Sequence, residues 1–239
     1  MKLEGRKKDI FDILCEKKRA SVSELSKILY VCEMTVRRDL SEMEKQGLLK
    51  RYRGGAIYIE GNELPISRRM YLSGDEKRML AKKAELYLAD DITVYIDSSS
   101  TCHYIIPHLK KFNNIKIVTN SINALTSAAK LHIPCFLIGG DYYEQDMCFV
   151  GSASVQCAEN INVDVAFFTT KGLSQDGIIS DPDLCQTAVR YSIMKNAKKN
   201  IFLFEKEKIG KKYLHTLCRA DSADGIIISD QKFKKFKKF

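Results

Sequence analysis

The sequence predicts an α/β protein in two parts: a small N-terminal head of three helices and a hairpin, and a larger domain of alternating strands and helices. Apolar residues recur at helical spacing in three short segments before residue 46. A pattern of strand, Gly-Gly and strand follows, and from residue 76 onward β-rich runs alternate with helical patterns. With 239 residues and 45% hydrophobic content, the chain can form a small domain joined to a medium one.

Three helices are expected in the head. The first covers residues 6–18 and ends in a basic cluster at 17–19, and the second begins at a cap on Ser21 and runs for about two turns. After a break at 30–32, the third covers 33–45 and is ended by Gly47. Their apolar stripes are Ile10, Ile13 and Leu14, then Val22, Leu25, Ile28 and Leu29, then Val36, Leu40 and Met43.

The outer face of the third predicted helix is polar and cationic. Opposite the apolar stripe lie Met34, Arg38, Ser41 and Lys45, flanked by Thr35 and Arg37. Two short helices joined by a tight turn, the second with cations and hydroxyls outside, form a helix-turn-helix whose second helix enters the major groove of DNA. An ordinary amphipathic surface helix explains the same wheel equally well.

The segment after this helix favours DNA binding. Residues 48–59 have β-rich ends around Gly54-Gly55, which predicts a hairpin, or wing, placed to touch the DNA backbone or minor groove. We therefore expect residues 1–60 to form a winged helix-turn-helix that binds a double-stranded DNA operator. The expected DNA-binding residues are Thr35, Arg37, Arg38, Ser41, Lys45, Arg51 and Arg53.

The net charge of +9 is concentrated at the two ends of the chain. Residues 1–60 carry 14 Lys and Arg against 10 Asp and Glu, and the basic tail, 232–239, carries 5 Lys and no acid. This pattern suits a head that binds a polyanion. The tail either attracts DNA or an acidic membrane surface, or is a disordered solubilising end.

Other classes of protein are disfavoured. No apolar run is long enough to span a membrane and no secretion signal opens the chain, so we expect a cytoplasmic protein without a membrane partner. The eight cysteines lack metal-ligand spacing, so we expect reduced thiols, no metal and no cofactor. A redox or metal sensor that uses these cysteines remains an alternative.

Residues 61–75 have no clear period and are expected to be a linker, followed by an α/β sensing domain over 76–231 with a largely parallel sheet. Its expected helices cover 76–89, 103–111, 122–131 and 182–199, and its expected strands cover 92–97, 115–120, 134–140, 163–170, 200–205 and 224–230. In such sheets a ligand binds beyond the carboxyl ends of the strands.

Hydroxyls, glycines and lysines gather at these strand ends, where they predict a site for a phosphorylated small molecule. Ser99, Ser100, Thr101 and Lys208 are expected to hold the phosphate, and Asp97 to orient polar groups of the ligand. The remaining expected ligand-binding residues are Thr119, Asn120, Ser121, Gly139, Gly140, Asp141, Lys171 and Gly172. Taken singly, each loop is also explained by helix capping or a turn.

Motifs in both parts resemble one family. Val-Ser-Glu-Leu-Ser-Lys-Ile-Leu at 22–29, Glu-Met-Thr-Val-Arg-Arg-Asp-Leu at 33–40, and Arg53-Gly-Gly-Ala resemble the head of DeoR-family bacterial transcription regulators. The order Asp97-x-x-x-Thr, Thr119-Asn-Ser, Gly139-Gly-Asp and Lys171-Gly is similar to that family's sensor domain. The resemblance implies a fold like ribose-5-phosphate isomerase and CoA-transferase proteins, DNA contact through Thr35, Arg37 and Arg38, and a phosphorylated sugar or related metabolite as effector.

The chain departs from that family's pattern at four places. Cys32 replaces a usual capping Ser, Ser99 a usual Gly, and Gln186 a usual Glu, while Glu205-Lys-Glu-Lys208 stands where Asp-x-Ser-Lys is typical. Ser99 lets the backbone approach a phosphate less closely. These changes leave the predicted fold intact and weaken the case for an ordinary sugar phosphate.

The expected function is a regulator that represses a sugar or carbon metabolism operon as a homo-oligomer, dimer or tetramer, until an effector binds. One alternative is a sugar-phosphate isomerase with a DNA-binding head, but it needs a carboxylate base, and no spacing singles out Asp97, Asp141 or Glu207. Another is a hydrolase that uses Ser98, Ser99 or Ser100, but the Gly-x-Ser-x-Gly motif is absent. We therefore expect no catalytic residues.

Overall fold

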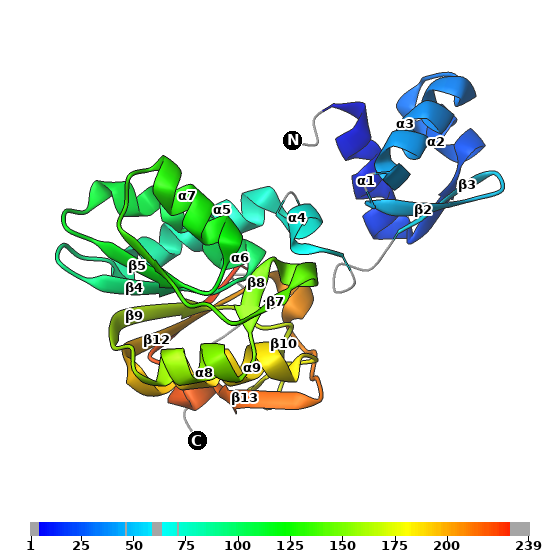
Figure 1. Ribbon diagram of the computed structural model, residues 1–239. Helices are drawn as coiled ribbons and strands as arrows, with labels where there is room; N and C mark the ends of the chain where they lie inside the picture. Colours follow the sequence, from blue (N-terminus) through cyan, green and yellow to red (C-terminus); the bar gives the residue numbers. More distant parts are fainter. Residues whose placement is uncertain (1–4, 46, 59–63, 71, 230–239) are drawn as a thin grey trace. The chain divides into compact units, whose positions relative to one another are not determined.

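The computed structural model describes residues 5–45, 47–58, 64–70 and 72–229. The chain forms two compact units, one up to Leu72 and one from Ser73 onward, and each has its own hydrophobic core (Figure 1). The predicted basic tail, 232–239, and the first residues of the predicted linker, 61–63, lie outside the described residues. Within the described ranges, no helix is long and apolar enough to cross a membrane.

The first unit packs three helices against a small antiparallel sheet of order β1-β3-β2. The elements are α1 (Arg6–Lys17), β1 (Arg19–Ser21), α2 (Val22–Leu29), α3 (Glu33–Lys45), β2 (Leu49–Tyr52) and β3 (Gly55–Tyr58). One buried cluster joins the stripes of all three helices, including Leu14, Leu25 and Leu40. The predicted three-helix head and its hairpin are confirmed.

Local backbone chemistry fixes the ends of these helices. The Ser21 hydroxyl accepts the backbone N–H of Glu24 at 3.1 Å, which caps α2 as predicted. Tyr30 adopts a left-handed conformation, with φ of 53°, and makes the tight turn between α2 and α3. Gly47, with φ of 67°, follows the last turn of α3 in a conformation that favours glycine.

Strand β1 was not expected from the sequence. Arg19 was placed in the basic cluster at the end of the first helix, but Lys18 takes φ of 65° and Arg19 instead begins β1, opposite Ile57. Three residues are too few to show an alternating pattern, so only pairing with β3 reveals the strand. The hairpin gains a third strand that ties it to the helices.

The predicted linker, 61–75, contains regular structure where it is described. Helix α4 (Ile66–Arg69) begins after Pro65, and α5 (Gly74–Ala84) starts before the predicted domain boundary. A four-residue helix is too short to display a 3.6-residue period, so no periodic pattern predicts it. The change from one unit to the next falls between Leu72 and Ser73.

The second unit is built on a six-stranded parallel sheet of order β14-β12-β9-β4-β5-β6, which confirms the predicted α/β layout (Figure 1). The strands are β4 (Thr93–Ile96), β5 (Lys116–Thr119), β6 (Cys135–Leu137), β9 (Val163–Phe168), β12 (Ala197–Phe204) and β14 (Gly225–Ile228). The larger helices are α5, α7 (Ile122–Lys130), α8 (Ser152–Glu159) and α9 (Leu184–Asn196), with the short α6 (Ser100–His103) and the 3₁₀ turns η1 (Glu85–Tyr87) and η2 (Ile106–Lys111).

Alternate residues of each strand feed two cores on opposite faces of this sheet. Val94 and Ile96 of β4 pack with α5, α6 and α7, whereas Tyr95 faces α8, α9 and a second, antiparallel sheet. That second sheet has the order β10 (Gly172–Leu173), β11 (Ile178–Asp181) and β13 (His215–Arg219). Both faces are therefore covered, as a parallel sheet requires.

Several elements of this unit had no counterpart in the prediction. They are α8, the second sheet, the hairpin of β7 (Asp141–Tyr143) and β8 (Cys148–Val150), and the 3₁₀ turns η3 (Glu144–Asp146), η4 (Lys206–Lys208) and η5 (Ala220–Ser222). Strand β12 also begins three residues earlier than expected, because α9 ends at Asn196. Most of these elements are two to five residues long, too short for periodicity to detect.

Candidate functional site

Helix α3 presents the predicted DNA-facing residues away from the core of the first unit. Arg37, Arg38 and Lys45 are exposed, and Thr35 and Ser41 are half-buried at the edge of the exposed face. The opposite face, with Val36, Leu40 and Met43, is fully buried. The two predicted wing residues, Arg51 and Arg53, are also exposed. The structure thus makes these side chains available to a ligand, and their contact with DNA stays a prediction.

Ion pairs within the head hold some of these cations in place. Arg37 Nη2 lies 3.1 Å from Glu33 Oε2, one turn earlier on α3. Arg51 Nη1 lies 4.0 Å from Glu44, whose carboxylate also accepts the Arg51 N–H at 2.7 Å. The wing strand is therefore fastened to the end of the recognition helix.

A buried carboxylate that the sequence analysis missed connects α3 to α1. Asp39 is only 2% exposed, and Arg6 Nε donates to its Oδ2 at 2.5 Å. This hydrogen bond, more than the charge attraction between the two groups, raises the pKa of the Arg6 guanidinium despite desolvation. The sequence signal was an acidic residue beside the apolar Val36 and Leu40, on the buried side of the wheel.

Cys32 stands at the start of α3, where the resemblance expects a serine cap. Its Sγ lies 3.2 Å from Thr35 Oγ1, and hydrogen bonds from Thr35 lower the pKa of the thiol. The sulfur thus occupies the capping position, with the longer and weaker contacts that sulfur makes.

In the second unit, polar residues gather at the carboxyl ends of neighbouring strands. Residues 97–101 follow β4, residues 119–121 follow β5, residues 169–170 follow β9, and residues 205–208 follow β12. All of these except Lys206 and Glu207 are buried. The predicted convergence of the first, second and last of these loops is observed, and Thr169 joins them.

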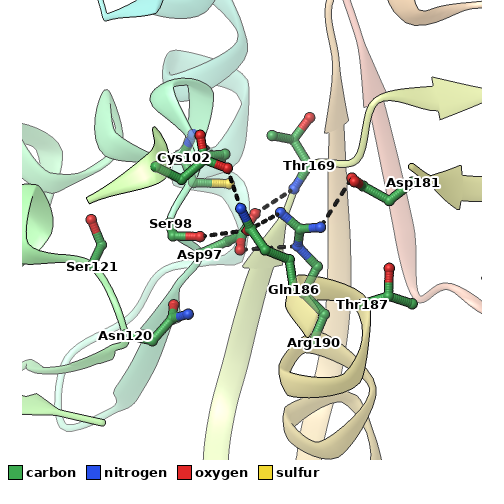
Figure 2. A network of polar contacts seen from close by, with 12 residues as sticks. Asp97, Ser98, Cys102, Asn120, Ser121, Thr169, Asp181, Gln186, Thr187 and Arg190 are labelled. Carbon is green, nitrogen blue, oxygen red and sulfur yellow. Dashed lines mark hydrogen bonds and ion pairs between the residues drawn. The ribbon is translucent and has the colours of Figure 1, made fainter. Parts of the chain in front are cut away.

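Arg190 of α9 is the centre of this cluster (Figure 2). Its guanidinium donates to Asp97 Oδ1 at 3.1 Å, to Asp181 Oδ2 at 3.0 Å and to Gln186 Oε1 at 2.9 Å. Arg190 is only 5% exposed, and burial disfavours its charge, but the two carboxylates outweigh that cost and raise the pKa of the guanidinium. Asp97 Oδ2 also accepts the Thr169 N–H at 3.3 Å.

Gln186 joins three elements around this arginine. Its Oε1 accepts from Ser98 Oγ at 2.9 Å as well as from Arg190 (Figure 2). Its Nε2 donates to Asp146 of η3. An amide supplies both a donor and an acceptor, which a carboxylate does not. The departure from the usual Glu at this position is thus matched by a carboxylate, Asp146, on the β7–β8 hairpin.

A second group of buried charges surrounds Lys208. Its Nζ lies 3.1 Å from Glu205 Oε2 and donates to Thr169 Oγ1 at 3.2 Å, while Thr101 donates to Glu205. Lys77 of α5 donates to Ser100 Oγ at 3.0 Å. Burial opposes ionisation of Glu205, but the neighbouring lysines and hydroxyl lower the pKa of its carboxyl to about 2.

Several predicted ligand residues have structural partners of their own. Ser99 caps α6 by accepting the Cys102 N–H, and Ser121 caps α7 by accepting the Ala124 N–H. Thr119 donates to the Ile96 carbonyl at 2.6 Å, and Asn120 donates to the Phe149 carbonyl at 2.9 Å. These four therefore shape the loops, whatever else they bind.

The remaining predicted residues lie at the edge of the cluster. Gly139, Gly140 and Asp141 are exposed, and a side chain at Gly140 would collide with the Val150 carbonyl. Gly172 is buried in β10, where a Cβ would lie 2.6 Å from the Lys211 carbonyl oxygen. Lys171 contributes its backbone N–H to Asp181 at 3.2 Å. Close packing explains both Gly140 and Gly172 without a ligand.

Five members of the cluster were not named in the sequence analysis: Lys77, Asp146, Thr169, Asp181 and Arg190. Lys77 and Arg190 were findable, because each lies on the buried stripe of its helix, three residues before the apolar Leu80 or Ile193. Asp146 and Asp181 lie in short elements whose burial depends on distant strands. In the described part of the chain, no group of His, Cys, Asp or Glu is placed to hold a metal ion.

This arrangement, a winged helix-turn-helix head and an α/β domain with a polar cluster at its strand ends, defines a transcription regulator that binds DNA. Residues 6–62 match the DeoR-like helix-turn-helix domain, and residues 73–231 match the DeoR C terminal sensor domain. The chain belongs to the DeoR family of transcription regulators.

Transcription regulators are similar in sequence to this chain over nearly their whole length. The HTH-type transcriptional regulator GolR of Listeria innocua serovar 6a is 27% identical over 98% of this chain and 94% of its own. The glycerol-3-phosphate regulon repressor of Escherichia coli K12 is 25% identical over 95% of this chain and 90% of its own. Ribose 5-phosphate isomerase A of Methanocaldococcus jannaschii has 17% identity and a TM-score of 0.42, covering 57% of this chain and 54% of the isomerase. The chain thus spans about half the length of that enzyme.

Proposed function

We propose that this regulator represses an operon of sugar or carbon metabolism in the cytoplasm and releases its operator when a phosphorylated small molecule binds the second unit. The observation that carries the proposal is the convergence of buried charges and hydroxyls at the carboxyl ends of four parallel strands, in a chain whose other unit is a helix-turn-helix. The name of the relative that represses a glycerol-3-phosphate regulon supports the same class of effector.

The charges of the cluster suggest how such an effector lies. Lys77 and Lys208 both lie close enough to Glu205 to lower the pKa of its carboxyl, so two cations meet on this side of the cluster, which suits a phosphate. Arg190 faces two carboxylates, Asp97 and Asp181, so that side carries excess negative charge. Since a carboxylate oxygen has more than one lone pair, Asp97 can still accept from sugar hydroxyls.

The operator is bound by the head. In the proposed complex, α3 lies in the major groove with Thr35, Arg37, Arg38, Ser41 and Lys45 toward the DNA, and the wing brings Arg51 and Arg53 to the backbone or minor groove. A homo-oligomer, dimer or tetramer, would place two heads on repeated half-sites, and the effector would change their spacing.

A screen of phosphorylated sugars by thermal shift, followed by operator release in a gel-shift assay, tests this function. Lys208→Ala is expected to bind operator normally and to lose the response to the effector, because Lys208 belongs to the strand-end cluster of the second unit. An exposed lysine of the same unit, Lys198, gives the matched control Lys198→Ala, with an unchanged response. A normal response of Lys208→Ala would remove Lys208 from the site.

Sugar-phosphate isomerisation is the rival activity. It needs a carboxylate free to take a proton, but Asp97 is paired with Arg190, Glu205 with Lys208, and position 186 holds an amide. Incubation of the protein with ribose 5-phosphate is expected to yield no ketose, and ketose formation that Glu205→Gln abolishes would establish an enzyme instead.

A further inference from the structure

Met34, in the first turn of α3, is an exposed apolar residue in the middle of the proposed DNA-facing surface. Its side chain is 76% exposed. All residues of α3 are described, and the other apolar side chains of this helix, Val36, Leu40 and Met43, are fully buried in the head. Met34 therefore contributes little to the fold by packing, and its side chain is available to contact a ligand.

The neighbours of Met34 show which ligand its surface meets. Arg38 lies four residues later on the same face, and Thr35 is adjacent. In a helix-turn-helix, residues near the N-terminus of the second helix reach the edges of the bases, whereas cations farther along grip phosphates as well. Met34 occupies such a base-reading position, and its side chain has no hydrogen-bond donor.

Among the groups that bases expose in the major groove, the 5-methyl of thymine is the apolar one. The methionine side chain is unbranched and polarisable, so it adapts to a methyl group at a position not fixed in advance. We propose that Met34 reads a thymine methyl group in the operator and so adds a preference that the charged residues of α3 do not supply. This inference rests on the proposed operator binding through α3.

The salt dependence of binding separates the proposed methyl contact of Met34 from the electrostatic contacts of α3. Arg37 is paired with Glu33 on its own helix, and Arg38 is attracted by Glu42. Their contacts with phosphate release counterions and set the salt dependence of binding, whereas a methyl contact releases none. Replacing Met34 is therefore expected to change sequence preference and leave the salt slope unchanged.

The test uses the full chain and an operator selected from random DNA duplexes by the wild-type protein. Each thymine of the operator is replaced in turn by deoxyuridine, which removes only the methyl group, and dissociation constants are measured by fluorescence anisotropy. At one thymine, the wild type and Met34→Leu are expected to lose about three- to tenfold in affinity. Met34→Gln, which has a similar length and a polar end, is expected to show no loss on that replacement.

Two comparisons make the result decisive. Leu86→Ala removes an exposed apolar side chain from the second unit, at 87% exposure, and is expected to retain the full deoxyuridine effect. Arg38→Ala is expected to lower the salt slope by about one, while Met34→Gln keeps it. Equal deoxyuridine losses in the wild type and Met34→Gln at every thymine would overturn the role of Met34 but not operator binding. A wild type that binds selected and random duplexes equally would overturn both.

Discussion

The recognition helix and the strand-end cluster use the same kinds of side chain in opposite surroundings. Arg37 and Arg38 of α3 are exposed, with partners on their own helix, whereas Arg190 is enclosed with carboxylates that follow β4 (Asp97) and end β11 (Asp181). Removing an exposed charge changes the free energy of unfolding little. Removing one partner of a buried ion pair leaves the other charge buried and uncompensated, which lowers that free energy strongly. The comparison teaches that changes on the exposed face of α3 affect folding little, whereas changes among the buried charges of the cluster affect folding as well as any ligand binding.

The largest expected effect tests this contrast directly. Arg190→Ala leaves Asp97 and Asp181 buried without their cation and is expected to lower the free energy of unfolding by about 3–5 kcal/mol. Arg37→Ala, which breaks an exposed ion pair, is expected to change it by less than about 1 kcal/mol. Urea unfolding followed by circular dichroism measures both, and equal losses in the two variants would break the comparison.

Substitution of Gln186 is expected to have a smaller effect on stability, which a second substitution can reverse. Gln186→Glu places a carboxylate against Asp146 and is expected to cost about 2 kcal/mol of stability, because the donor to Asp146 is lost and like charges meet. Adding Asp146→Asn restores a donor and an acceptor with the roles exchanged. The double variant is expected to recover at least about 1 kcal/mol, and strictly additive losses would show that the two side chains do not interact.

Acid titration sharpens the contrast between buried and exposed carboxylates. The pKa of Glu205 falls from 4.5 to about 2 on folding, so its contribution to stability is fully present above pH 4.5 and is lost as the pH falls toward 2. Glu205→Gln is expected to flatten the loss of stability in that window.

Glu85, which is half-buried and paired with the exposed Lys82 and Lys111, supplies the more accessible control for this titration. Its pKa is also lowered to about 2, by hydrogen bonds from Lys111, Lys82 and His108. Salt at about 0.5 M is expected to shrink its effect more than that of Glu205, because water and ions screen exposed pairs. Identical salt responses of Glu205→Gln and Glu85→Gln in the acid range would contradict the expectation that Glu205 is better shielded from salt than Glu85.

The smallest expected effect on folding is paired with a clear effect on binding. Arg38→Ala is expected to leave the unfolding midpoint unchanged and to weaken operator binding by about 1–3 kcal/mol if it reads a base. If Arg38 grips phosphate instead, the salt slope falls by about one. Unchanged affinity and unchanged salt slope in gel-shift titrations would remove Arg38 from the interface.

The head was more predictable from the sequence than the cluster. The bounds of α3 were predicted to the residue, since its apolar stripe, polar face and closing glycine are all local. The loops after β4 and β5 were also located correctly, because strand ends follow from hydrophobic runs. Arg190 was missed because its pairing with Asp97 depends on which distant elements become neighbours in the fold, and Asp181 was missed because its partner is Arg190. Local spacing encodes neither contact.

Some elements were not predicted because they are short, and for some residues the sequence allowed two roles. Strand β1 and helix α4 are three and four residues long, so a periodic signal had no room to develop. For Ser99 and Ser121 the position was predicted, but their hydroxyls cap α6 and α7 in the structure. The same hydroxyl can cap a helix or bind a ligand, and the sequence alone does not show which of the two roles it has.

The Arg6–Asp39 pair makes the groove-reading helix dependent on the beginning of the chain. Because Asp39 is enclosed and Arg6 is its cationic partner, the pair ties α3 to the first turn of α1. Arg6→Ala would leave that carboxylate buried without its cation. The first turn of α1 thereby helps to set the orientation of the helix that we propose to read the operator.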